Sequence, residues 1–88
     1  MIEKELEVKG RAGIHARPAS ALAKTASSFS SSVFIIKDTM KVNAKSIMGI
    51  ITLGATYKTR LLFQIEGEDE KEAMAAIEKL FDNQFEES

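Results

Sequence analysis

The only histidine of the chain, His15, lies in the segment GIHARPAS at residues 13–20. Histidine has the side-chain pKa nearest to neutral pH, so an imidazole can act as a nucleophile or proton carrier without a cofactor. Gly13 permits an unusual backbone turn before it, and Pro18 suits the first turn of a helix, where a missing N–H costs little. The pattern therefore predicts that His15 lies at a helix N-terminus, where unpaired N–H groups and the helix dipole attract anions.

The neighbours of His15 indicate chemistry on a phosphoryl group. The Arg17 guanidinium can hold a phosphate through a forked, charge-assisted contact. The backbone N–H groups of Ala16 and Arg17 have no helical partner at a helix start, so they can bind phosphate oxygens. The structural alternative is that Gly13 and Pro18 only shape the start of a helix while His15 faces water, and the local residues leave that alternative open.

The same neighbourhood favours a phosphocarrier over a self-sufficient enzyme. No Ser-His-Asp arrangement, metal-binding motif or P-loop can be read from the residue spacing. With one histidine and no cysteine, a zinc site would need several carboxylates. We therefore expect no metal and no cofactor, and a protein that is phosphorylated by one partner and then phosphorylates another.

The composition predicts one small folded domain over residues 1–88. Apolar residues make up 44% of the chain and charged residues 28%, as in ordinary soluble proteins. A formal net charge of −1 argues against a nucleic-acid binder, which usually has a basic excess. The N-terminus is charged, unlike a signal peptide, and no segment is apolar enough to insert into a membrane. We expect a cytoplasmic protein.

Hydrophobic periodicity predicts four strands and three helices. The predicted strands are residues 2–8, 33–36, 40–44 and 60–66, and the helices are 16–27, 47–53 and one that begins after Asp69. This β-α-β-β-α-β-α order, with a hairpin in the middle, predicts an α+β, two-layer open-faced sandwich: a four-stranded antiparallel sheet with three helices on one face. The order of strands within the sheet does not follow from periodicity.

Three further residues carry local predictions. Asp69 is expected to N-cap the last helix with Glu72 three residues on, close to a capping box. Phe29 is expected to anchor the serine-rich loop around it to the core. The tail, residues 85–88, is expected to be frayed.

Ser46 is a plausible N-cap for the short helix that follows it. The five apolar residues of that helix are too many for one buried face: Ile47, Met48, Ile50, Ile51 and Leu53. We expect Ile47, Met48 and Ile51 to form an exposed docking patch, because such a patch with an adaptable methionine is a common binding surface. The alternative is a helix buried on most sides.

Two motifs resemble those of a known family. Residues 13–19, GIHARPA, resemble the active-site signature of HPr, the histidine-containing phosphocarrier family of the sugar phosphotransferase system. Residues 45–54, KSIMGIITLG, resemble its regulatory serine signature, and residues 67–70 resemble the start of its last helix. The resemblance covers essentially the whole chain in the expected order.

The resemblance implies a phosphorylation cycle at His15. Enzyme I, charged by phosphoenolpyruvate, donates a phosphoryl group to the Nδ1 atom, and the phosphohistidine passes it to a sugar-specific IIA component. Arg17 and the helix N-terminus would stabilise the phosphate. The resemblance also assigns Ser46 to an ATP-dependent HPr kinase/phosphorylase, and adds a transcriptional regulator to the partners. We expect a monomer.

The chain departs from the family pattern at three places. The family usually has glycine in the hairpin turn, where this chain has DTM at 38–40, and before the fourth strand, where it has TYKT at 56–59. We expect these turns, including residues 57–58, to take another type. Ala12 replaces a small polar residue and removes one side-chain contact to the phosphate.

Two rival functions remain. One is a regulatory signalling protein that is read through its His15 and Ser46 phosphorylation state without sugar transport. The other is an unrelated α+β interaction domain in which His15 is incidental. Phosphohistidine is acid-labile and phosphoserine acid-stable, so the chemistry of the phosphorylated protein separates these functions.

Overall fold

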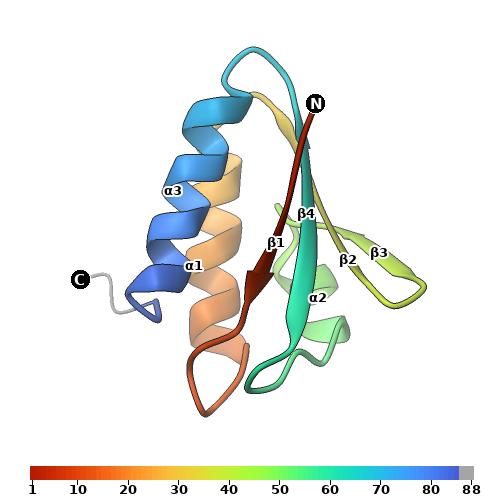
Figure 1. Ribbon diagram of the computed structural model, residues 1–88, viewed down its shortest axis with the longest axis vertical. Coiled ribbons are helices and arrows are strands. Elements are labelled where there is room, and N and C mark those ends of the chain that lie inside the picture. Colours follow the sequence, from red (N-terminus) through yellow and green to blue (C-terminus); the bar gives the residue numbers. More distant parts are fainter. Residues whose placement is uncertain (86–88) are drawn as a thin grey trace.

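The computed structural model describes residues 1–85, and its elements follow one another in the predicted order (Figure 1). The strands are β1 (Ile2–Glu7), β2 (Ser32–Lys37), β3 (Met40–Asn43) and β4 (Arg60–Glu66), and the helices are α1 (Ala16–Ser27), α2 (Ile47–Thr52) and α3 (Glu70–Asp82). The predicted bounds of β1, β2, β3 and α2 differ from these by one residue at their ends, where assignments commonly vary.

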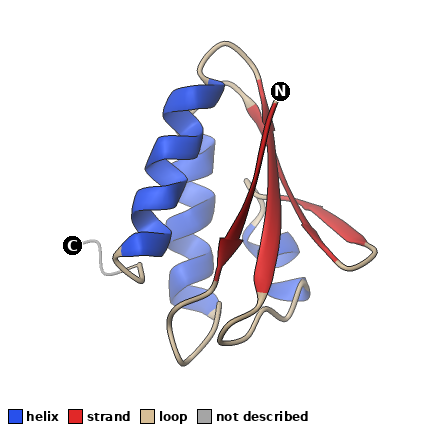
Figure 2. Cartoon of the chain, in the orientation of Figure 1, coloured by secondary structure: helices blue, strands red, loops and turns tan. Residues whose placement is uncertain are grey.

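The four strands form one antiparallel sheet in the order β1-β4-β2-β3. The last strand, β4, therefore lies between the first two, so that Leu6 faces Leu61 on one side and Val33 faces Ile65 on the other. The three helices pack on one face of the sheet (Figures 1 and 2), which confirms the α+β prediction. In the described residues, no helix is long and apolar enough to cross a membrane.

The core lies between the sheet and the helices. Every second residue of β4 points into it, and Leu61, Phe63 and Ile65 are fully buried. The apolar faces of α1 and α3 are buried in this core: Ala19, Leu22, Ala23 and Ala26 from α1, and Ala73, Met74, Ile77, Leu80 and Phe81 from α3. The alanines of α1 are buried in this core, and Phe29 packs against its edge as predicted.

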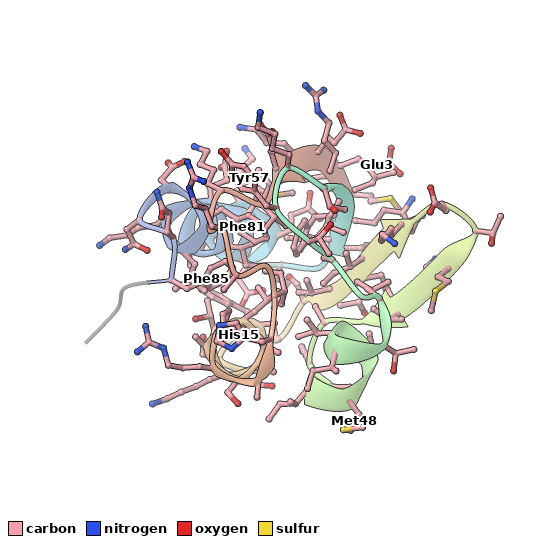
Figure 3. All side chains as sticks on the ribbon, turned by 90° about the horizontal axis from the view of Figure 1, so that it is seen from below. Glu3, His15, Met48, Tyr57, Phe81 and Phe85 are labelled. Carbon is pink, nitrogen blue, oxygen red and sulfur yellow. The ribbon has the colours of Figure 1, made fainter. Side chains whose placement is uncertain are left out.

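Within residues 1–85, no helix covers the other face of the sheet. Glu3 lies on this face (Figure 3), where its carboxylate accepts a hydrogen bond from Gln64 Nε2 at 2.5 Å. Ile2 and Leu6 of β1 pack against the core from the opposite face.

The predicted capping box at α3 is wrong, although Asp69 does occupy the N-cap position. Its side chain makes no capping bond within the helix and instead binds the serine loop. The carboxylate accepts hydrogen bonds from the backbone N–H groups of Ser30 at 2.9 Å and Ser31 at 3.0 Å, and from the Ser31 hydroxyl. Glu70, rather than Glu72, reaches back, and its carboxylate accepts from the Gly67 N–H at 3.1 Å.

The expectation of a frayed end is wrong at Phe85, because contacts with the last turn of α3 hold this residue. Its ring is buried and meets the Phe81 ring edge-on, with 4.9 Å between centroids. Its N–H donates to the Leu80 carbonyl at 2.8 Å. The rest of the predicted tail, residues 86–88, lies outside the described residues.

The two turns that lack the family's glycine keep a left-handed residue. Asp38 has φ of 56° and Lys58 has φ of 71°, so a residue with a side chain takes the conformation that glycine adopts most easily. The missing glycines therefore do not remove the positive φ from these turns.

We expect the Asp69→Asn variant to have a lower Tm than the wild type at neutral pH. The Ser31 hydroxyl and the Ser30 N–H lower the pKa of Asp69 to about 2. Because the folded pKa lies below the ordinary value of 3.8, the stabilisation is complete above that pH and is lost as the pH falls through about 2. The Tm values of the wild type and the variant are measured across this pH range by thermal unfolding, with circular dichroism as the signal.

The Tm difference between wild type and variant should shrink in acid. Asp82→Asn is the matched control, because Asp82 forms only an exposed ion pair with Lys9. A Tm difference for Asp69→Asn that stays constant down to pH 2 would contradict the assignment.

Candidate functional site

His15 is the N-cap residue of α1, as the sequence predicted. Its backbone is extended, with φ of −98° and ψ of −163°, and its carbonyl accepts the hydrogen bond of the Ala19 N–H at 2.9 Å. The imidazole makes no capping hydrogen bond and is exposed. The side chain that would ordinarily satisfy the helix start is thus directed elsewhere, and the helix N-terminus stays open to an anion.

The loop before His15 is held by the loop that follows α2. Gly13 has φ of 74°, and a Cβ atom there would lie 2.7 Å from the Ala55 carbonyl oxygen. Only glycine fits this left-handed position at such close approach. The next N–H, that of Ile14, donates to the same Ala55 carbonyl at 3.0 Å, and the Ile14 side chain is buried.

An open depression of about 360 Å³ lies at the His15 end of the molecule. His15 and Arg17 both line it. Arg11, Gln84 and Phe85 also line the depression, and no motif in the sequence indicates that these residues lie near His15. Gln84 and Phe85, which follow α3, reach the depression through a turn in which their φ values are 56° and 63°. Figure 3 shows Phe85 beside His15.

The electrostatic surroundings of the depression favour an anion. The first turn of α1 contains no acidic residue that would compete for its N–H groups, which include those of Ala16 and Arg17. Within residues 1–85, no carboxylate forms an ion pair with the exposed Arg17 side chain. Over the same residues, no group of three or more acidic or histidine side chains could hold a metal ion.

Ser46 caps α2, also as predicted. Its backbone is extended, its side chain is exposed, and its Oγ accepts a hydrogen bond from the Gly49 N–H at 3.1 Å. Just before it, the Lys45 ammonium donates to the Phe29 carbonyl at 2.9 Å and ties the start of α2 to the serine loop.

The short helix α2 divides its apolar residues between core and solvent. Ile50 and Leu53 are 1% and 2% exposed, whereas Ile47, Met48 and Ile51 are 42%, 69% and 36% exposed. The last three residues form the α2 patch. This division confirms the predicted exposed surface and contradicts the alternative of a helix buried on most sides. Figure 3 shows Met48 pointing outward from α2.

Comparisons with known proteins agree with this geometry. A family model described as "PTS HPr component phosphorylation site" matches residues 2–83. Phosphocarrier protein HPr of Treponema pallidum is 47% identical over 87 residues, which are 99% of each chain. The HPr-like protein Crh of Bacillus subtilis is 43% identical over 77 residues, 88% of this chain and 91% of Crh.

A solved structure gives the same result for the fold. The crystal structure of HPr-C-His from Thermoanaerobacter tengcongensis superposes with a TM-score of 0.94 at 45% identity, covering 100% of this chain and 99% of that one. With its four-stranded sheet, its three helices and its histidine at an open helix start, the chain belongs to the HPr family, the phosphocarriers of the sugar phosphotransferase system, which transfer a phosphoryl group without being enzymes.

Proposed function

We propose that His15 is the phosphorylated residue of this phosphocarrier. Phosphorylated enzyme I donates the phosphoryl group to Nδ1 of His15, and a sugar-specific IIA component receives it. The observation that carries this proposal is an exposed imidazole, the only one in the chain, at the uncapped N-terminus of α1 beside Arg17. No other histidine competes for the role.

For this transfer, the carrier must only position the imidazole and neutralise the negative charge of the phosphoryl oxygens. The Nδ1 lone pair forms a bond to phosphorus while the bond between phosphorus and the donor nitrogen or oxygen breaks on the opposite side. The negative oxygens of the phosphoryl group then meet the N–H groups of Ala16 and Arg17 and the Arg17 guanidinium. These contacts neutralise charge without a covalent bond, so the group can leave again for the next acceptor.

Ser46 is the proposed regulatory residue, phosphorylated by an ATP-dependent HPr kinase/phosphorylase. Its hydroxyl is exposed at the N-terminus of α2, where a phosphate is tolerated by the helix. The added negative charge would lie beside the α2 patch, which we propose as a docking contact for enzyme I and the IIA components. Phosphorylation of Ser46 would therefore weaken the docking of a partner whose contact surface is apolar or acidic, and it would leave the fold intact.

A second candidate function rests on the similarity to Crh. A solved Crh structure is described as that of a Bacillus subtilis catabolite repression protein, and this chain is 37% identical to it over 99% of its length. The alternative is a regulatory protein, read by a transcriptional regulator through the phosphorylated Ser46. Acid-labile label that moves to a IIA component supports the carrier, and label that is only acid-stable supports the regulatory protein.

The His15→Ala variant should accept no phosphoryl group and should fold like the wild type, because the imidazole makes no capping bond. Incubation with enzyme I and labelled phosphoenolpyruvate, followed by detection of acid-labile label, measures acceptance. Circular dichroism checks the fold. Undiminished acid-labile label on this variant would refute the assignment of His15.

The Arg17→Ala variant should retain acceptance but lose roughly tenfold or more in rate, since a charged donor to the phosphoryl oxygens is removed. Arg17→Lys keeps the charge without the planar fork, so its rate should fall between those of the wild type and Arg17→Ala. Single-turnover phosphorylation by enzyme I measures the rates. Equal rates for all three proteins would exclude a role for the guanidinium.

The Ser46→Asp variant should be phosphorylated at His15 roughly tenfold more slowly, because a negative charge beside the α2 patch opposes docking. Ser46→Asn is the matched control, since asparagine and aspartate cap a helix about equally well. Both variants should have Tm values near that of the wild type. Identical transfer rates for the Asp and Asn variants would rule out a charge effect.

A further inference from the structure

Two loops bring Arg11, Tyr57 and Lys58 together beside the His15 depression. The Arg11 guanidinium carbon lies 5.6 Å from the centroid of the Tyr57 ring, and the Lys58 ammonium lies 5.5 Å from it. Both distances suit attraction between a cation and an aromatic ring. We name this cluster the tyrosine edge. Arg11 also lines the depression, so this residue belongs to both the tyrosine edge and the surroundings of His15.

The backbone holds the tyrosine edge in place. Lys58 has the left-handed φ of 71°, which a residue with a side chain rarely adopts. Its N–H donates to the Val8 carbonyl at 2.8 Å, and the Val8 N–H donates to the Thr59 carbonyl at 2.9 Å. Thr59 Oγ1 in turn accepts the Thr56 N–H at 3.1 Å. The loop from β1 and the loop before β4 therefore form one bonded unit.

The charges at this end of the molecule are unevenly compensated. Lys9 and Arg60 form ion pairs of 3.3 Å with Asp82 and Glu5, respectively. In the described part of the chain, Arg11 and Lys58 form none. Arg17 likewise forms none, so this end of a chain with net charge −1 presents three cations without acidic partners.

We propose that the tyrosine edge is a second docking contact, and that it binds acidic side chains on the protein that exchanges a phosphoryl group with His15. The proposal rests on the proposed function of His15. Tyr57 is 42% exposed and lies between two cations, and tyrosine and arginine are residue types enriched at protein interfaces. An acidic protein surface complements this cluster, whereas nucleic acid would require a basic excess that the chain lacks.

The tyrosine edge and the α2 patch would make different contributions to docking. The α2 patch offers apolar area that is removed from water on contact. The charges of the tyrosine edge lie at the rim, where they chiefly raise the association rate and make it depend on salt. A partner that docks at His15 would thus meet two surfaces of different chemistry.

The test compares two variants with the same change in net charge. Arg11→Glu/Lys58→Glu reverses the two cations of the tyrosine edge, and Lys41→Glu/Lys71→Glu reverses two exposed cations outside both loops. The initial rate of phosphorylation by enzyme I and phosphoenolpyruvate is measured against the concentration of each protein, at low and at high salt. The KM of the first variant should rise roughly tenfold at low salt and vary less with salt than that of the wild type.

The control variant should change KM by less than about twofold, since only local rim charges affect steering. Tyr57→Phe keeps the aromatic ring and should have the KM of the wild type, whereas Tyr57→Ala should have a higher KM. Equal KM values for the two charge-reversed variants would overturn the proposal.

Further outcomes keep the two proposals distinct. If the wild type takes acid-labile label while the edge variant keeps the wild-type KM, the tyrosine edge is excluded and the function of His15 stands. If the wild type takes no acid-labile label, both proposals fail. Should circular dichroism show that the charge-reversed variant is unfolded, Arg11→Gln/Lys58→Gln replaces it with the same expected direction.

Discussion

The contact between Gly13-Ile14 and the Ala55 carbonyl decides the geometry of the whole His15 end. One carbonyl oxygen accepts the Ile14 N–H and leaves no space for a Cβ at Gly13. The chain must therefore turn left-handed one residue before Ile14 is buried, and His15 follows at the first extended position before α1. The imidazole is thus presented to solvent by a backbone contact in the preceding loop. Its position does not depend on a capping hydrogen bond of its own side chain.

The same carbonyl connects the two phosphorylation sites that we propose. Ala55 follows α2 by three residues, and α2 begins at Ser46. Ile50 and Leu53 anchor the helix in the core, so the exposed α2 patch and the His15 loop keep one relative position. A charge at Ser46 can then act on docking through space, without any movement of His15. A carrier that must be recognised by several proteins benefits from such a fixed surface.

Local patterns predicted much of this structure, and contacts between distant segments account for the failures. The N-cap position of His15, the cap at Ser46 and the split of α2 all follow from neighbouring residues. Asp69 was misread because its partners, Ser30 and Ser31, come from a loop far away in sequence. Strand order and the pairing of Arg11 with Tyr57 likewise depend on tertiary approach, which periodicity does not encode. The packing of Phe85 on Phe81 is local, and it depends on the two positive φ values at Gln84 and Phe85 after α3.

The lack of space for a side chain at Gly13 also determines which residues around His15 can be substituted during evolution. A side chain at residue 13 would collide with backbone, so selection must hold that residue as glycine. Its neighbours Arg11 and Ala12 are exposed, as is Tyr57 across the loop contact, and all three can be replaced without disturbing the turn. Side chains around the His15 loop can therefore diverge between lineages while the turn that presents the imidazole is inherited unchanged.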